Sequence, residues 1–334
     1  QSRVAVCEPV ASCYKTGVRC LVTGATGFIG GAVSRHLEAA GHELVAYVRE
    51  GSDSRALQDV ERVVGDLGDP NRLALAAAGC DAMVHAAGIA DPAADPDSLG
   101  WVHIAGTENA INAARKAGCR RLIHISCAEV TLYDGPRSFW NEDVAPPRPY
   151  GDLASTKLRA EELVRVSGRR GFRTTVLRPA LVWGPGDTTH LPRWQAEANE
   201  RGIRIVGRGK KLMSTTYIAN LAHAVRCSLE TKITTGNVYY VVDTELSVSR
   251  DFFTELGAAL GWSPPRRAGP YRWAWFSARA GLSSLHPTQV IRRGQTSAFE
   301  MTRAKHDLGY EPIVTREQGL SALAAWYHET AGAR

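Results

Sequence analysis

The stretch Thr23-Gly24-Ala25-Thr26-Gly27-Phe28-Ile29-Gly30 decides the fold, because it follows a β-rich run directly and precedes a helical pattern directly. Gly24 permits a tight turn, Gly27 lets backbone amides approach a pyrophosphate, and Gly30 allows the helix to pack closely on the strand. The helix N-terminus adds unpaired amides and the positive end of its dipole. The segment therefore predicts a dinucleotide site, with contacts from Gly24, Thr26, Gly27, Phe28, Ile29 and Gly30.

Short β-rich runs alternate with longer helical patterns over the first 180 residues, which is the signature of a parallel α/β sheet. We predict a Rossmann-type doubly wound domain over residues 18–180, preceded by a weakly attached tail at 1–17. The predicted strands are Arg19–Thr23, Glu43–Val48, Glu61–Val64, Ala82–His85, Arg121–Ser126 and Arg173–Leu177. The predicted helices between them include Gly30–Ala40 and His103–Ala117.

The pattern loosens beyond Pro179, where Pro and Gly interrupt shorter elements. We expect a smaller α+β substrate-binding region over residues 181–334, leaning over the carboxyl edge of the sheet. Part of 217–242 is expected to return to the main sheet, and 264–294 to form irregular or helical cover. The individual predictions are strands Arg204–Val206 and Val238–Val242, and helices Asn220–Leu229, Ser249–Leu260 and Arg316–Tyr327.

Composition excludes several classes of function. The chain has 334 residues, 44% of them hydrophobic, and a formal net charge of +6 that is scattered rather than clustered, so nucleic-acid binding is not indicated. No run approaches the roughly 18 apolar residues of a membrane span. The seven cysteines show no zinc-type spacing and no disulfide framework, which favours a reducing cytoplasm and argues against a metal site.

The end of the second predicted strand tests the choice of cofactor. A site that selects NAD usually places a carboxylate there, to accept hydrogen bonds from the ribose 2′-hydroxyl. Here the strand leads into Arg49, and Ser52 follows shortly after. A guanidinium and a hydroxyl suit a 2′-phosphate, so we favour NADP(H). NAD(H) remains the alternative if Glu50 or Asp53 serves the ribose.

With these motifs in place, the chain from Val18 to Tyr327 resembles the extended short-chain dehydrogenase/reductase family. The similar branch contains the 3β-hydroxysteroid dehydrogenase-like and NAD-dependent epimerase/dehydratase-like proteins. Besides the glycine-rich segment, the matching motifs are Gly65-Asp66-Leu67, His85-Ala86-Ala87-Gly88, Gly106-Thr107-Glu108-Asn109, Arg178-Pro179, Gly184-Pro185-Gly186-Asp187, Tyr217-Ile218-Ala219-Asn220 and Lys305-His306-Asp307-Leu308-Gly309-Tyr310. Ala219 departs from an acidic residue common in its motif.

The resemblance implies roles for residues at the cofactor and at the reaction centre. It places Asp66 and Leu67 beside the adenine, and Ala86, Ala87, Gly88 and Pro179 along the cofactor. The family's reaction centre combines a Ser after the fifth strand with a Tyr and a Lys four residues apart on the next helix. Lys157 matches the Lys, but Leu153 stands at the Tyr position. Cys127 stands at the Ser position, one residue after Ser126.

Three interpretations of this altered centre stay open. In the first, redox chemistry is kept and Tyr150 supplies the proton, seven residues before Lys157 and on the same face if the helix already includes it. Tyr133 is a looser candidate. In the second, the pocket serves a redox-silent isomerase, cyclase, lyase or transferase, with acid–base groups from Asp152, Glu129, Asp187 or His190, or with Cys127 as nucleophile. In the third, the protein binds a nucleotide without catalysis.

We favour an NADP(H)-dependent oxidoreductase that acts on a carbonyl or alcohol of a small cyclic metabolite, alicyclic or aromatic. The alternative is the redox-silent enzyme, in specialised metabolism. Tryptophans of the second half are candidates to line such a pocket: Trp183, Trp194, Trp262, Trp273 and Trp275. The resemblance also leads us to expect a homodimer, formed through the helices near 103–117 and 151–166.

Overall fold

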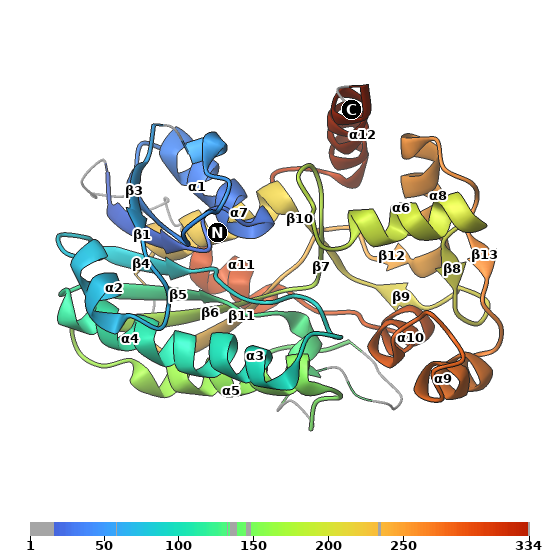
Figure 1. Cartoon of the computed structure of the whole chain (residues 1–334), viewed down its shortest axis with the longest axis horizontal. Coiled ribbons are helices and arrows are strands. Elements are labelled where there is room, and N and C mark those ends of the chain that lie inside the picture. Colours follow the sequence, from blue (N-terminus) through green and yellow to red (C-terminus); the bar gives the residue numbers. More distant parts are fainter. Residues whose placement is uncertain are drawn as a thin grey trace, which may run out of the picture.

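The computed structural model describes residues 17–57, 59–131, 133, 139–144, 148–232 and 235–332. Most of the predicted tail, 1–16, thus lies outside the described residues. The centre of the described chain is a seven-stranded parallel sheet in the order β11-β6-β5-β4-β1-β2-β3 (Figure 1). Its strands are β1 (Arg19–Thr23), β2 (Glu43–Val48), β3 (Glu61–Val64), β4 (Ala82–His85), β5 (Arg121–Ile125), β6 (Arg173–Pro179) and β11 (Asn237–Val241).

Helices cover both faces of the sheet, so the predicted doubly wound α/β fold is confirmed. Successive strand residues point to opposite faces, and in β1 Cys20 and Val22 join one buried cluster while Leu21 joins the other. The first cluster includes residues of α1 (Phe28–Ala39) and α7 (Ile218–Glu230). The second includes residues of α2 (Pro70–Ala76), α4 (Gly106–Lys116) and α5 (Asp152–Ser167).

The strand order reverses between β1 and β4, which pair directly in parallel register. In doubly wound sheets the ligand crevice lies outside the carboxyl ends of the strands at this reversal. The glycine-rich segment follows β1 and the His85-Ala86-Ala87-Gly88 motif includes the end of β4, so the topology brings both motifs to one crevice.

Several boundaries differ from the sequence predictions. Strand β5 ends at Ile125 instead of Ser126, and β6 continues to Pro179. The predicted helix His103–Ala117 is the end of a longer helical run that starts with α3 (Pro96–Gly100) and passes through a π-helical turn, Trp101–Ala105. A π-turn shifts the hydrogen-bond register by one residue, so a search for a 3.6-residue period does not detect it.

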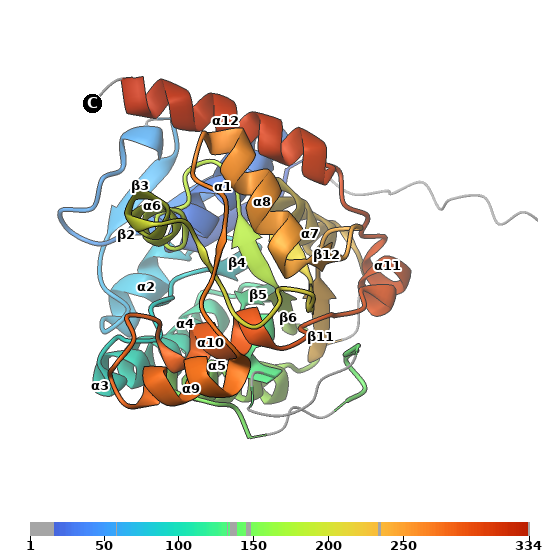
Figure 2. The same ribbon diagram turned by 90° about the vertical axis from the view of Figure 1, so that its right-hand side faces the viewer.

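The second half of the chain both completes the sheet and builds a separate layer (Figure 1). Strand β11 pairs in parallel with β6. The layer contains helices α6 (Leu191–Glu200), α8 (Ser249–Leu260), α9 (Tyr271–Arg279), α10 (Pro287–Gly294) and α12 (Arg316–Gly332), with short strands β7 (Leu181–Trp183), β8 (Arg204–Ile205), β9 (Leu212–Met213), β10 (Thr215–Tyr217), β12 (Ser247–Val248) and β13 (Arg266–Arg267). Helix α11 (Thr302–Leu308) instead packs against β11 and α7 of the sheet. Residues 264–294 thus include two helices. Figure 2 shows α12 beside α8. The division at residue 180 stays a prediction.

Candidate active site

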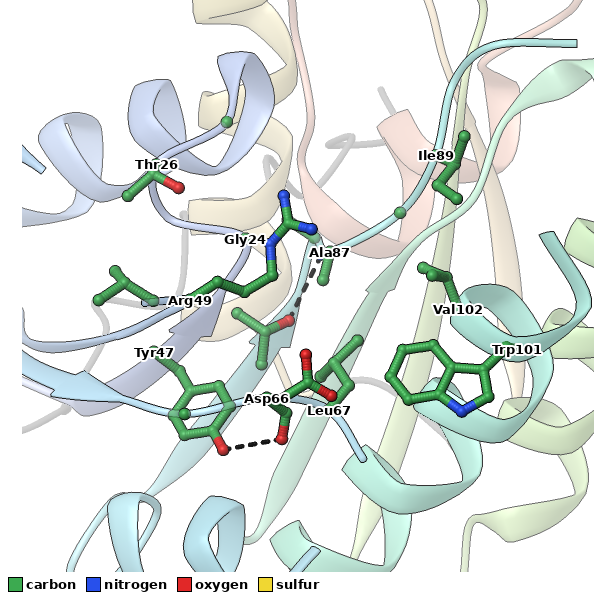
Figure 3. Close-up of a pocket in the computed structure, with 16 residues that line it drawn as sticks. Gly24, Thr26, Tyr47, Arg49, Asp66, Leu67, Ala87, Ile89, Trp101 and Val102 are labelled. Atoms are coloured by element: carbon green, nitrogen blue, oxygen red, sulfur yellow. Dashed lines mark hydrogen bonds between the residues drawn. The ribbon is translucent and has the colours of Figure 1, made fainter. Parts of the chain in front are cut away.

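A cavity of about 330 Å³ lies at the strand-order reversal, and Figure 3 shows the side chains around it. The residues that line it come from the ends of β1, β2 and β4, from the segment after β3 and from the π-helical turn. Of the predicted cofactor residues, the cavity is lined by Gly24, Thr26, Gly27, Arg49, Asp66, Leu67, Ala86, Ala87 and Gly88. A cavity of this size, open between a glycine-rich turn and a helix N-terminus, fits part of a dinucleotide.

The glycines of the turn are required by close backbone approaches. Gly24 has a φ of +70°, and a Cβ there would lie 2.8 Å from the backbone nitrogen of Ala87. A Cβ at Gly30 would collide with the carbonyl oxygen of Gly24. The Gly27 amide donates to that same oxygen at 2.9 Å, which closes the turn. The Gly24–Gly27 backbone is thereby fixed beside the cavity, at the N-terminus of α1.

The predicted adenine side is held by hydrogen bonds to the backbone. The Tyr47 hydroxyl donates to the Asp66 carbonyl at 3.0 Å, and the Asn109 side chain donates to the Leu67 carbonyl at 2.8 Å. The Trp101 indole faces Leu67 from the other side of the cavity (Figure 3). Tyr47, Trp101, Val102 and Ile89 are lining residues that the sequence analysis missed. Trp101 lies in the π-helical turn, for which the sequence offered no signal.

The end of β2 supplies a cation to the cavity. Arg49 extends into it (Figure 3), whereas the Asp53 carboxylate is turned to the Arg55 guanidinium, with N–O distances of 2.6–3.2 Å. The Ser52 hydroxyl donates to the Arg49 carbonyl at 2.5 Å and does not line the cavity. The structure thus brings Arg49 to the site and leaves Ser52 and Asp53 on the neighbouring turn.

The remaining predicted cofactor residues lie around the cavity without lining it. Phe28 and Ile29 open α1 and pack partly against the core, and Gly30 is buried beneath the turn. Pro179 is buried at the end of β6, on the opposite side of β5 from β4. These residues support the site's backbone in this structure.

Lys157 reaches from α5 to the carboxyl ends of β4 and β5. Its Nζ donates to the Ile125 carbonyl at 3.3 Å and would lie 3.0 Å from a Cβ at Gly88. Burial lowers the pKa of the Lys157 ammonium, and the nearby Cys127 and Glu161 act in the opposite direction. Glu161, one turn later on α5, is bound by the Arg178 guanidinium of β6 at 2.6 Å in a buried ion pair. That pair anchors α5 to the sheet and so positions Lys157.

Of the two altered residues of the centre, Leu153 is buried and Cys127 is half-buried. Leu153 is 6% exposed one helical turn before Lys157. Burial raises the pKa of the Cys127 thiol, so the neutral form is favoured and a nucleophilic thiolate is not. Ser126 is buried, and its hydroxyl has no hydrogen-bond partner within the described residues. Ser126 is thus a free hydroxyl at the end of β5.

Tyr150 does not belong to α5. The helix starts at Asp152, and its N-cap Gly151 has a φ of +87°, so the chain turns sharply between Tyr150 and the helix. The two-turn spacing that would place Tyr150 and Lys157 on one helical face therefore does not apply. Tyr150 is half-buried before the helix, and its role stays a prediction. Tyr133 contacts the Trp140 ring edge-on, at 6.2 Å between centroids.

The alternative acid–base candidates have structural partners. The Asp187 carboxylate accepts from the amides of Thr189, His190 and Leu191 at 2.7–3.2 Å, which caps the start of α6. The His190 ring stacks on Trp194, and burial lowers its pKa to about 4. Glu129 forms an ion pair with Arg292 of α10, and Asp152 is exposed.

The tryptophans proposed for a substrate pocket are dispersed. Trp194 lines a cavity beside α10, whereas Trp183 packs in the core against Tyr217 and Phe252. Trp262 donates to the Tyr327 hydroxyl at 3.1 Å, and Trp273 is mostly exposed. Within the described ranges, no group of His, Cys, Asp and Glu side chains is arranged to hold a metal ion. No described helix has the length and apolar character to cross a membrane.

The fold and the site define a nucleotide-cofactor enzyme of the extended short-chain dehydrogenase/reductase type. The sequence profile of the NAD dependent epimerase/dehydratase family matches residues 20–241, and the chain belongs to that family. The resemblance stated from the motifs is thereby confirmed. The family depends on nicotinamide cofactors.

Relatives with reductase names cover nearly the whole chain. The 2-alkyl-3-oxoalkanoate reductase of Stenotrophomonas maltophilia (strain K279a) is 31% identical over 332 residues, covering 92% of this chain and 99% of the relative. A 4-hydroxy-2-methyl-3-oxo-4-farnesyl-3,4-dihydroquinoline-1-oxide ketoreductase of Stigmatella aurantiaca is 31% identical over 322 residues, with coverage of 92% and 96%. A 3-beta-hydroxysteroid dehydrogenase of Mycolicibacterium neoaurum is 27% identical, with coverage of 92% and 91%.

Solved structures support the same fold. The crystal structure of gox2253 has a TM-score of 0.78 and 26% identity, and covers 94% of this chain and 99% of its own. A double mutant of DesIV, the dTDP-glucose 4,6-dehydratase of Streptomyces venezuelae, solved with NAD bound, has a TM-score of 0.77 and 21% identity, with coverage of 94% and 98%.

Proposed function

We propose that this protein is an NADP(H)-dependent reductase that acts on a ketone of a small metabolite. The observation that carries the proposal is the cavity beside the Gly24–Gly27 turn, into which Arg49 extends from the end of β2. A guanidinium there pairs with a 2′-phosphate, and the alternative carboxylate of Asp53 is held by Arg55. The names of the relatives, which are reductases and dehydrogenases of oxo or hydroxy compounds, support redox chemistry at a carbonyl or alcohol.

Residues of the chain bind the cofactor and orient the substrate oxygen. When bound, the nicotinamide supplies the hydride. Lys157 holds the ribose side of the cofactor at Gly88, as the family resemblance implies. Ser126, a buried hydroxyl with no partner in the described structure, donates a hydrogen bond to the substrate oxygen and stabilises the charge that develops there. Leu153 and neutral Cys127 transfer no proton, which leaves the final protonation of that oxygen to water or to Tyr150.

The names of the relatives indicate a broad class of substrate. The first relative's name specifies a 3-oxoalkanoate and the second a cyclic 3-oxo compound. We propose a 3-oxo compound as the substrate and include the cyclic metabolites expected from the sequence. A redox-silent reaction is the second candidate. It is favoured by the buried Leu153 and the half-buried, neutral Cys127, which stand in place of Tyr and Ser.

Calorimetric titration of NADPH and NADH tests the cofactor proposal. We expect the wild type to prefer NADPH, and Arg49→Gln to weaken NADPH binding about 10- to 100-fold with little change for NADH, because a charge-assisted contact is removed. Arg120→Gln, an exposed arginine that pairs with Asp81 and does not line the cavity, is the control and should leave both affinities unchanged. A wild type that prefers NADH, or an Arg49→Gln variant that loses both cofactors equally, contradicts the proposal.

Single-turnover absorbance with NADPH and a panel of 3-oxo compounds tests the reaction. Oxidation of the cofactor by any of them supports the reductase. Tight NADPH binding without oxidation across the panel favours the redox-silent candidate instead.

A further inference from the structure

Arg292 of α10 separates two small cavities at the carboxyl edge of the sheet. They have volumes of about 20 and 30 Å³, and both are lined by Leu181, Met213 and Arg292. The second is also lined by Ala128 and Ala180, which follow Cys127 and Pro179 at the ends of β5 and β6. Arg292 therefore lies beside the predicted reaction centre, on the side of the C-terminal layer.

The side chain of Arg292 is largely shielded from solvent, and one of its donors is unused. Its side chain is 16% exposed, and it forms an ion pair with the Glu129 carboxylate. Its Nε is buried with no partner among the residues that the structure describes. Burial lowers the pKa of Arg292 to about 10, which leaves the group charged at neutral pH. An unsatisfied donor on a buried cation is costly, so a ligand that accepts from it gains affinity.

Two neighbouring arginines, Arg293 and Arg193, have no such unpartnered buried nitrogen. Arg293 binds the Glu197 carboxylate through both terminal nitrogens, at 2.8 and 3.0 Å, and also donates to the Arg204 carbonyl at 3.1 Å. Arg193 binds Asp91 at 2.8 Å with a side chain that is 37% exposed to water. Arg292 differs from both, because it combines burial, an unused donor and two cavities beside it.

We propose that Arg292 binds a carboxylate of the substrate, and that the substrate is therefore an oxo acid. This inference rests on the proposed reductase function and narrows its substrate class. In the free protein the Glu129 carboxylate neutralises Arg292. The Glu129 side chain is 23% exposed, and it rotates toward the solvent when a substrate carboxylate replaces it at Arg292. A carboxylate and a guanidinium match as a planar, two-hydrogen-bond pair.

The position of Arg292 favours a 3-oxo acid among the oxo acids. In such a compound one carbon separates the carboxylate from the ketone. A carboxylate held at Arg292 then leaves the ketone close to the end of β5, where Ser126 and Cys127 lie. A ketone without a carboxylate would gain no binding affinity from Arg292, because Arg292 would stay paired with Glu129.

The experiment compares a 3-oxo acid with its methyl ester in NADPH-dependent turnover. We expect the wild type to prefer the acid. Arg292→Gln should lower kcat/KM for the acid about 10- to 100-fold and leave the ester unchanged, with partial recovery in Arg292→Lys. Arg279→Gln is the matched control, because Arg279 is an exposed cation of α9 that stacks on Trp275 and lines neither cavity. It should keep the preference for the acid within about twofold.

Glu129→Gln provides a second test if Arg292→Gln fails to fold. Removal of the internal competitor should tighten binding of the corresponding 3-hydroxy acid, measured by calorimetry in the presence of NADP⁺. Unchanged or weaker binding of the hydroxy acid, or equal losses for acid and ester in Arg292→Gln, would overturn the inference. Failure of the proposed reductase function gives a different result. The wild type would then oxidise NADPH with neither the acid nor the ester, and this result does not depend on the binding of the hydroxy acid.

Discussion

Lys157 occupies its family position while the residue one helical turn earlier, Leu153, cannot exchange a proton. Glu161 and Arg178 still anchor the helix that carries the ammonium, so the geometry of α5 is maintained without the tyrosine. The sequence alone placed Leu153 and Cys127 at the two altered positions, and these assignments stay predictions. It could not show that the Ser126 hydroxyl is unpaired, because hydrogen-bond partners depend on the folded structure. It also could not show that Arg292 lies close to Cys127, because 165 residues separate the two along the chain and only the fold brings them together.

Leu153→Tyr should increase turnover with a substrate that the wild type reduces. The phenol would stand four residues before Lys157, a helical rise of about 6 Å, and a positioned general acid contributes about 10²-fold or more. Overpacking at this buried site should reduce the free energy of unfolding by about 1–3 kcal/mol. Leu153→Phe is the control, with the same bulk and no hydroxyl. Equal turnover in the two variants, measured under saturating NADPH, would show that the hydroxyl at this position takes no part.

At the scale of elements, periodicity predicted most of the sheet and missed what depends on hydrogen-bond register. Strands β1, β2, β3 and β4 and helix α8 have the predicted bounds, because each is a strongly patterned run with turn residues at both ends. The π-helical turn Trp101–Ala105 was not predicted, and it carries Trp101 into the cofactor cavity. The start of α5 was also left open, since the sharp turn at Gly151 depends on a positive φ that Gly permits but does not dictate.

The junction of β1 and α1 should tolerate no side chain at Gly30. In Gly30→Ala the new Cβ would lie 2.6 Å from the carbonyl carbon of Gly24, so the helix must move away from the strand. We expect a loss of about 1–3 kcal/mol in unfolding free energy and at least tenfold weaker NADPH binding. Gly100→Ala, where a Cβ would meet nothing within 4 Å, is the control and should be neutral or slightly stabilising. Urea unfolding and calorimetry measure both effects, and equal behaviour of the two variants would contradict the prediction.

Across the whole molecule, buried histidines make the stability of the folded protein depend on pH. His85 is held between the hydroxyls of Thr23 and Thr107 at 2.8 and 3.1 Å, and it stacks on His124 of β5. Burial lowers the pKa of His85 and of His103 to about 3, that of His190 to about 4, and that of His124 well below its usual range. The folded protein therefore keeps these rings neutral, whereas the unfolded chain protonates them near pH 6.5.

Stability should consequently fall as the solution is acidified. A base whose pKa is lowered by folding contributes its full stability above the unfolded pKa, and loses it as the pH decreases toward the folded pKa. Each histidine should reduce the unfolding free energy by up to about 1.4 kcal/mol per pH unit below about pH 6. Urea titrations from about pH 7 to about pH 5 measure the slope, since most carboxylates have not yet titrated there. An unfolding free energy that does not change over this interval would contradict the prediction.

Strand β11 has a consequence for the order in which the molecule is made. It pairs with β6 at the edge of the sheet, although α6, α7 and several short strands separate the two along the chain. During synthesis, the first 179 residues can form six strands while the Thr175–Pro179 edge still presents unpaired backbone hydrogen-bonding groups. The ribosome must add about 60 further residues, a few seconds of translation, before that edge is covered. A nascent chain arrested or cleaved in this interval is the form of the protein most exposed to aggregation and to chaperones.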